Sequence, residues 1–400
     1  MNLFKQIFIG LVIATCPILS LYSIRHISVS FILMLFCYIF FIRKRLIALT
    51  SKYTKAIWAF ALEIALISLN GLLLNYIGDS LILAIIMLLI GVVVYLPVMH
   101  ESDKLITYYC FVAVAYICCI VAFYQFFATI TGATYFSGRF EFLELDSSVV
   151  GWMPGSFGFR FNSLFSEPSY FAIYMLPIFA FSLKNNHYIN SIFFGIGIIL
   201  SSSSMGILCL PALVMYELVF KKGMLKRDYK SIIIIGVLVL IVVNIFQKNE
   251  NIIGVLHRST NKIERINSEG DSRLFGGIEL YSELPSKESL FGVGLAQMAN
   301  YFEMHGKSIP NYANTPVTIL INCGAVGFLC LLIFYFRVFR ISLKNNNLSF
   351  FFLLVAISCA DPLIYNQRFY HLIYFIYFMI GNLPKIEKRK TSDILLQKTR

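Results

Sequence analysis

The sequence predicts an all-α polytopic integral membrane protein with about 12 transmembrane helices and two long loops on its outer side. Three observations predict this class. Hydrophobic residues make up 58% of the 400 residues and charged residues only 14%, which excludes an ordinary soluble domain. Several separate apolar runs approach the roughly 17–25 residues with which a helix crosses a bilayer. The lysines and arginines, finally, are distributed unevenly between the alternating loops.

The apolar runs form one predicted polytopic domain, residues 1–400. The first run follows Lys5 and leads into a second apolar run without a small-residue cleavage site, so we expect an uncleaved first span. Four serines at residues 201–204 are expected to separate two spans; the alternative is one long helix whose hydroxyls bond back to the backbone. The predicted spans cover about 7–22, 29–42, 57–74, 81–98, 105–128, 169–183, 189–202, 205–220, 231–247, 316–336, 348–361 and 369–384.

The basic residues orient these spans. If the N-terminus is cytoplasmic, 22 of the 33 lysines and arginines fall on the cytoplasmic side, as the positive-inside rule requires. Both termini are then inside, and residues 385–400 form a basic cytoplasmic tail. Residues 129–168 and 248–315 become the first and second periplasmic loops, where function is expected because loops carry it on a rigid scaffold. The net charge of +12 reflects orientation, so we expect contact with membrane lipids and no nucleic-acid partner.

Several classes of chemistry lack their motifs. The nine cysteines fall almost entirely in or beside apolar runs and have no metal-ligand spacing with histidine. Walker, Rossmann and zinc signatures are absent as well, so we expect no metal and no cofactor. A membrane transporter or flippase remains an alternative hypothesis to an enzyme. It would favour charged side chains along a cavity within the spans, whereas here the charges gather in the outer loops.

The stretch Arg160-Phe-Asn-Ser-Leu-Phe-Ser-Glu-Pro-Ser-Tyr170 concentrates polar chemistry where the first outer loop meets a span. Pro168 suits a first helical position, and an acid such as Glu167 is favoured beside a helix N-terminus. The structural alternative is a helix cap together with a surface ion pair between Arg160 and Glu167.

Other outer-loop residues are candidates of the same kind. Arg273 precedes Leu-Phe-Gly-Gly, and arginine binds phosphate oxygens bidentately at any relevant pH. His305 lies in a Met-His-Gly turn, where the alternative is a solvated loop histidine. Trp152 belongs to a set of aromatic residues that either stack on sugars or form an interfacial belt. This set is Tyr135, Phe136, Phe140, Phe142, Trp152, Phe157, Phe159, Phe161 and Phe165.

The stretch from Arg160 to Ser169, at the opening of a span, resembles the motif of the O-antigen and capsule repeat-unit polymerases (Wzy). These belong to the O-antigen ligase and polymerase superfamily. A looser second match consists of Arg273, Pro285, Phe291-Gly-Val-Gly294, Asn314 and Gly324-Ala-Val-Gly327.

The resemblance implies a GT-C-like glycosyltransferase of the bacterial inner membrane with its active site facing the periplasm. The implied donor is a growing glycan on undecaprenyl diphosphate, and the acceptor is the non-reducing end of a lipid-linked repeat unit. The class implies metal-independent displacement at C1 and a chain-length regulator protein as a further partner. Glu167 and His305 are the implied catalytic residues. Arg160, Arg273, Asn314 and Trp152 are the implied substrate-binding residues.

One departure separates two members of the superfamily. Its ligases carry a His-Asn step shortly before the late Gly-x-x-Gly, where this chain has Ala313-Asn314. The missing histidine favours a polymerase over an O-antigen ligase that transfers glycan to lipid A core. It also leaves the general base unassigned. Three roles stay open for Glu167: it accepts the proton of the attacking hydroxyl, it orients that hydroxyl, or it holds Arg160 in place.

Overall fold

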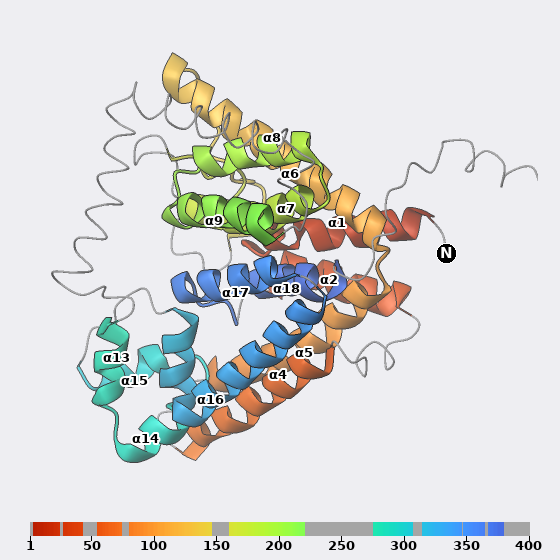
Figure 1. The fold of residues 1–400 in the computed structure, drawn as a ribbon. Coiled ribbons are helices and arrows are strands. Elements are labelled where there is room, and N and C mark those ends of the chain that lie inside the picture. The colour runs from red at the N-terminus through yellow and green to blue at the C-terminus, as the bar shows by residue number, and fades with distance from the viewer. Residues whose placement is uncertain are drawn as a thin grey trace, which may run out of the picture.

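The computed structural model describes residues 3–24, 27–42, 54–73, 80–145, 160–220, 275–306, 314–345, 347–364 and 367–379. Over these residues the chain is mostly helical, as predicted (Figure 1). The second predicted loop, 248–315, contains three short helices in its described part. Trp152, Arg273, the predicted span 231–247 and the tail 385–400 lie outside the described residues.

The N-terminal part supplies five α-helices and a short 3-10 turn at the predicted positions. Helix α6 has the clearest boundaries: the Asp103 carboxylate accepts from the backbone N–H groups of Leu105 and Ile106, each at 3.0 Å. It ends at Gly132, whose φ of 69° suits a left-handed C-cap. The elements are α1 (Leu3–Leu19), α2 (Val29–Phe41), α4 (Thr54–Ser68), η1 (Leu69–Leu73), α5 (Ser80–Glu101) and α6 (Lys104–Thr131).

The middle and C-terminal parts follow the same pattern. Two helices flank the serine turn, as predicted, and Ser202 breaks the helix with a φ of 46°. The Ser201 hydroxyl also bonds back to Ile198 O at 2.6 Å. The elements are α7 (Pro168–Lys184), α8 (Tyr188–Leu200), α9 (Ser204–Phe220), α13 (Phe275–Ser282), α14 (Ser286–Phe291), α15 (Met298–Met304), α16 (Thr315–Lys344), α17 (Leu348–Ala360), α18 (Gln367–Ile373) and the π-helical turn η2 (Tyr374–Phe378).

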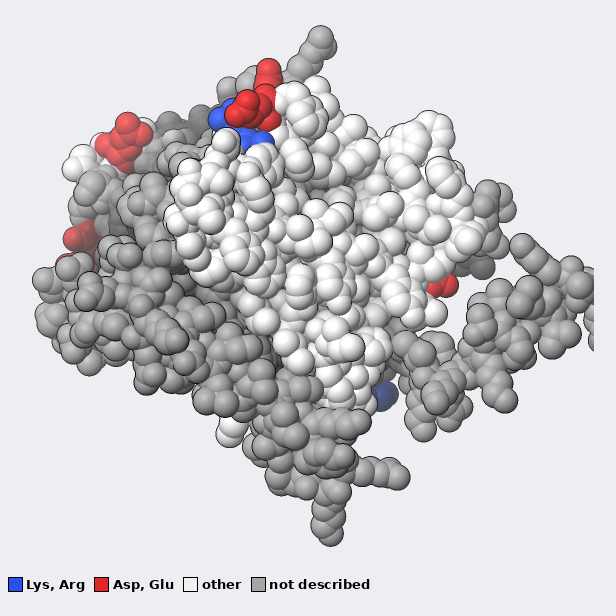
Figure 2. Space-filling model, turned by 90° about the horizontal axis from the view of Figure 1, so that it is seen from above, with Lys and Arg blue, Asp and Glu red and all other residues white. Residues whose placement is uncertain are grey.

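Three of the described helices, α5, α6 and α16, are long and apolar enough to cross a membrane. Shorter apolar helices accompany them at α1, α2, α8, α9 and α17. Figure 2 shows one face of the molecule, whose described surface is almost uncharged at its centre and carries charged side chains near its margins. Such a surface fits contact with lipid. The total of about 12 spans stays a prediction.

One element departs from the all-α prediction. Strand β1 (Tyr22–Ile24) pairs antiparallel with β2 (Ile27–Ser28) and with β3 (Glu144–Leu145). The pairing carries the first outer loop back to the chain between α1 and α2, and the Tyr22 hydroxyl accepts from Phe140 N at 3.0 Å. Strands of two or three residues leave no hydropathy pattern, so a sequence does not reveal them.

The helices form one extended apolar core, and a second, smaller cluster lies around the N-terminal half of α16. The smaller cluster joins α16 to α13, α14 and α15 through Leu284, Val293, Tyr301, Phe302, Val317 and Ile321. In Figure 1 these short helices lie at the end of the molecule opposite the N-terminus, and the C-terminal end of α6 points toward that same side.

Candidate functional site

The residues before α7 are almost wholly buried. Residues 161–166 are each at most 7% exposed, so this part of the motif belongs to the core and does not form an open loop. The amide of Gln125 on α6 holds the backbone of Ser163 on both sides: Oε1 accepts from Ser163 N at 2.9 Å and Nε2 donates to Ser163 O at 3.2 Å. Satisfying both groups allows a loop backbone to be buried.

The polar side chains of this segment are used in the same way. Asn162 donates to Ser137 O at 3.1 Å and also to Phe165 O. The Ser163 hydroxyl donates to Cys118 O at 2.6 Å. These contacts give Asn162 and Ser163 a structural role and leave Arg160 and Glu167 as the half-exposed ionisable residues of the motif.

The first-loop aromatics divide accordingly. Phe161 and Phe165 are 1% exposed and pack in the core, so neither of the predicted roles, sugar stacking or an interfacial belt, applies to these two. Phe142, in contrast, is 83% exposed, and Phe136 is also open to its surroundings.

Glu167 occupies the N-cap position of α7, but its side chain makes no capping hydrogen bond. Its backbone carbonyl accepts the first hydrogen bonds of the helix, from Tyr170 N at 3.1 Å and Phe171 N at 3.3 Å. Oε2 of the carboxylate accepts from the Ser169 hydroxyl at 3.0 Å. The carboxylate therefore does not form the side-chain cap of the structural alternative, and the ion pair with Arg160 stays a prediction.

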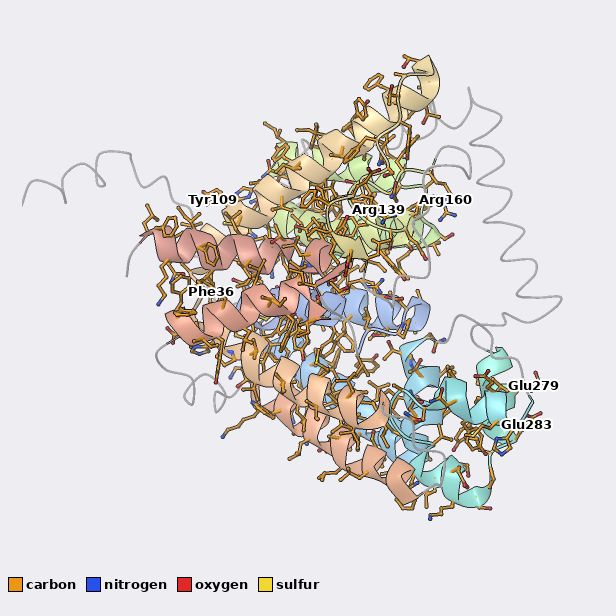
Figure 3. The ribbon with its side chains drawn as sticks, turned by 180° about the vertical axis from the view of Figure 1, so that it is seen from behind. Phe36, Tyr109, Arg139, Arg160, Glu279 and Glu283 are labelled. Atoms are coloured by element: carbon orange, nitrogen blue, oxygen red, sulfur yellow. The ribbon has the colours of Figure 1, made fainter. Side chains whose placement is uncertain are left out.

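Arg160 and Arg139 lie on the α6–α7 side of the molecule, whereas Glu279 of α13 and Glu283, just after this helix, lie away from them beside the short helices (Figure 3).

A group of four side chains, which we term the Arg368 cluster, surrounds the start of α7: Glu167, Tyr170, Asp361 and Arg368. Arg368 Nη1 lies 2.9 Å from Asp361 Oδ2, and both side chains are nearly buried, with 11% and 12% of their area exposed. The guanidinium carbon lies 3.6 Å from the centre of the Tyr170 ring, within the range of a cation–π contact. Tyr170 also interacts electrostatically with Asp361 and Glu167, so the four residues form one neighbourhood.

Helix packing fixes this cluster. Helices α7 and α18 run side by side in the same direction, because Tyr170 meets Arg368 and, one turn further, Tyr174 meets His371. His371 Nε2 lies 3.1 Å from Tyr174 O, and the two rings stack at 4.8 Å. The cluster therefore rests on rigid helices and does not depend on a loose loop.

The start of α16 is tied to the same place. The Thr315 hydroxyl donates to Asp361 O at 2.7 Å and accepts from Leu363 N at 2.8 Å. Beside it, the buried Asn314 caps α16 by accepting from Val317 N at 2.9 Å through its side chain. Asn314, predicted to bind substrate, thus has a clear structural contact and lies next in sequence to a residue that holds the Arg368 cluster.

The looser motif comes together at a second place, the glycine junction, formed by residues 292–294 and 321–324. Helix α16 is broken at Gly324, where φ is 66° and ψ is −168°. The break frees two carbonyls: Ile321 O accepts from Val293 N at 3.0 Å and Asn322 O accepts from Gly294 N at 2.9 Å. A Cβ on Gly324 would lie 2.3 Å from the Leu290 carbonyl, so only glycine permits this approach.

His305 lies apart from these contacts. It is exposed at the C-terminal end of α15, where Nδ1 lies 2.7 Å from Tyr301 O and the two rings are 4.4 Å apart. Its described hydrogen bonds and ring contacts stay within α15 and do not reach the Arg368 cluster. Its predicted catalytic role therefore has no geometric support in the described part of the chain.

Sequence reasoning missed Arg368 and Gln125. In the sequence, Asp361 followed by Pro362 indicates a turn at the end of a helix. Arg368 is one of the basic residues that the predicted topology places on the outer side. A signal was available in hindsight: an acid and an arginine seven residues apart lie between two apolar runs on the predicted outer side. Nothing in the sequence marks Gln125, a neutral residue inside an apolar run.

The fold and these contacts define a class: a mostly helical protein with helices able to cross a membrane and a charged cluster where three of its helices begin. No protein-family model and no curated protein matches this chain.

Proposed function

We propose that this protein is a glycosyltransferase that joins undecaprenyl-diphosphate-linked oligosaccharide repeat units into O-antigen or capsular polysaccharide. The reaction takes place at the periplasmic face of the bacterial inner membrane. The observation that carries the proposal is the Glu167 carboxylate. It is half-exposed, is not used as a helix cap, and belongs to a cluster with Asp361, Arg368 and Tyr170 at the end of an apolar bundle. The resemblance of residues 160–169 to the polymerases supports the choice of reaction.

A carboxylate in this position suits the chemistry of the reaction. The hydroxyl oxygen of the acceptor sugar attacks C1 of the donor sugar, and the bond from C1 to the phosphate oxygen breaks. The polyprenyl diphosphate leaves with the bonding electron pair. As the bond to C1 forms, the hydroxyl proton passes to Glu167, which acts as the general base and orients the hydroxyl for attack through the same hydrogen bond. The Ser169 hydroxyl, 3.0 Å from Oε2, holds the carboxylate in one orientation.

The leaving group needs positive charge. Arg160 and Arg273 are the proposed partners of the diphosphate, because a guanidinium binds two phosphate oxygens at once and stabilises the charge that develops. Arg160 lies on the segment that leads directly to Glu167. Lysine retains the charge but loses the planar fork, so we expect Arg273→Lys to impair polymerisation strongly even at normal protein levels. Full-length polymer from Arg273→Ala cells would remove this residue from the site.

Deletion of the gene tests the reaction class. A cell without the polymerase would display single capped repeat units on its surface. A cell without a ligase would display none and accumulate lipid-linked polymer, and a cell without a flippase would retain single units inside. Either of the last two results would replace the proposed function.

Glu167→Gln tests the residue. The amide nearly preserves the shape of the carboxylate but cannot take a proton, so we expect loss of polymer with the protein still inserted in the membrane. Glu303→Gln, at an exposed acid on α15, is the control and should polymerise normally. If Glu167→Gln retains polymer length and amount while Glu167→Ala loses protein from the membrane, Glu167 is structural.

A further inference from the structure

The Arg368 cluster contains more negative than positive charge. Glu167 and Asp361 each carry a negative charge when ionised, and Arg368 contributes the single positive charge among its four members. Arg368 is already paired at 2.9 Å with Asp361, and its guanidinium lies on the Tyr170 ring. A diphosphate entering this neighbourhood would meet two carboxylates and a neutralised arginine. Like-charge contacts of this kind oppose binding.

The same groups suit a neutral sugar. A carboxylate accepts hydrogen bonds from hydroxyls, and a guanidinium donates several in a fixed plane. An acid–arginine pair therefore offers acceptors and donors together to neighbouring hydroxyls, and the hydrogen bonds are strengthened because the protein groups are charged. Both side chains retain about a tenth of their area exposed, so the pair is buried enough to be ordered and still accessible at its edge.

The pair is also held in place before any ligand arrives. The backbone on which Asp361 sits is bound at two points by Thr315, at 2.7 and 2.8 Å, and Arg368 rests on Tyr170 of α7. Sites that are fixed in this way lose little conformational freedom on binding. The same α7 carries Glu167 at its start, so a sugar bound to the pair would present its hydroxyl near that carboxylate.

We propose that Asp361 and Arg368 bind the acceptor sugar, the hydroxyl-bearing non-reducing end of a repeat unit, and do not bind the diphosphate of the donor. This inference rests on the proposed function and assigns the two substrates to different residues of the same region. Asp361 and Arg368 are positioning residues in this assignment: they hold the acceptor, and Glu167 acts on its hydroxyl.

The test separates the two substrates. Lipid-linked repeat units, extracted from cells that lack this gene, serve as donor. The same oligosaccharide, released from its lipid diphosphate by mild acid, serves as a soluble acceptor. The full-length protein is reconstituted in bilayers, and the KM is measured for each substrate at a saturating concentration of the other. The variants are Asp361→Asn, which preserves the shape of the side chain but removes its charge, and Arg368→Lys, which retains the charge but loses the planar fork.

We expect both variants to raise the KM for the soluble acceptor by about tenfold or more and to leave the KM for the donor within about twofold. Arg340→Lys is the matched control: this arginine also lies over an aromatic ring, 6.0 Å from the centre of Phe336, but near the other end of α16. It should change neither constant.

Three results would overturn the inference alone, and a fourth would overturn it together with the proposed function. A rise in the donor KM alone would assign the pair to the diphosphate, and unchanged constants would leave it without a role in binding. The charge-reversed double variant Asp361→Arg/Arg368→Asp restores an ion pair, so full recovery of the acceptor KM by it would show that the pair is structural. If the wild-type protein joins no units at all, the proposed function fails and this inference fails with it.

Discussion

Gln125 and Ser163 are joined by a reciprocal pair of hydrogen bonds, in which one side-chain amide satisfies both the N–H and the C=O of one backbone residue. Gly138 contacts the same carbonyl so closely that a Cβ there would lie 1.7 Å from Ser163 O. Ser163 itself has a φ of 55°, an uncommon conformation for a residue with a side chain. The fully buried Gln125 therefore holds the backbone that leads to Glu167.

Gln125→Leu should destabilise the protein, because it leaves two buried backbone groups of Ser163 without their partner. The expected loss in the free energy of unfolding is about 2–4 kcal/mol. The measurement is thermal melting of the purified protein in detergent. Tyr124→Phe is the control: it removes one hydrogen bond to Thr134 O at an exposed side chain and should cost about 1 kcal/mol or less. Equal melting temperatures for both variants would contradict the role given to Gln125.

A comparison of Gly132→Ala with Gly324→Ala separates two costs in the free energy of unfolding: that of a positive φ and that of a close contact. The φ values of the two glycines are similar, 69° and 66°, but a Cβ on Gly132 would meet nothing within 4 Å, whereas one on Gly324 would lie 2.3 Å from Leu290 C and O. Gly132→Ala should cost about 1–2 kcal/mol, and Gly324→Ala clearly more, because α14 must move away from α16.

The same thermal melts measure both variants. A Gly324→Ala protein as stable as Gly132→Ala would show that the glycine junction can open without cost, and this would remove the reason for glycine at residue 324.

The burial of His187, in the turn between α7 and α8, predicts that the stability of the protein depends on pH. Burial lowers the pKa of His187 below its ordinary value of 6.5, and its Nδ1 faces the Tyr108 hydroxyl. The unfolded chain therefore takes up a proton at a higher pH than the folded chain. The contribution of His187 to stability is present in full above pH 6.5 and decreases as the pH falls through 6.5 toward the lower, folded pKa.

His187→Gln should remove this part of the slope. The measurement is the melting temperature of both proteins between neutral and mildly acidic pH, and the difference between the two curves is the relevant quantity. Parallel curves would exclude a contribution from His187.

The orientation in the membrane is a fourth prediction. The basic residues place the second loop outside and the connection after α16 inside. A reporter fused at Asn249 should therefore give a periplasmic signal and one fused at Lys344 a cytoplasmic signal. The opposite pattern would reverse the membrane face on which Glu167 acts and would reject the proposed orientation.

The sequence alone determined where the helices lie. Helices occupy eleven of the twelve predicted span positions, and the twelfth, 231–247, lies outside the described residues. This succeeds because the transfer of an apolar run out of water depends mainly on the run itself, and Pro168 and the serine turn mark their boundaries locally. The sequence also drew attention to Arg160 and Glu167, since charge is rare in so apolar a chain.

Only the tertiary structure decided which polar residues meet. Arg368 reaches Tyr170 across almost two hundred positions of the chain, and Val293 bonds to a carbonyl that becomes free only where α16 breaks. Neither contact follows from local propensity, because each depends on how two helices pack and on which backbone groups that packing leaves without a partner. For the same physical reason Asn162 and Ser163, which belong to the polymerase-like stretch, are occupied in holding a buried loop.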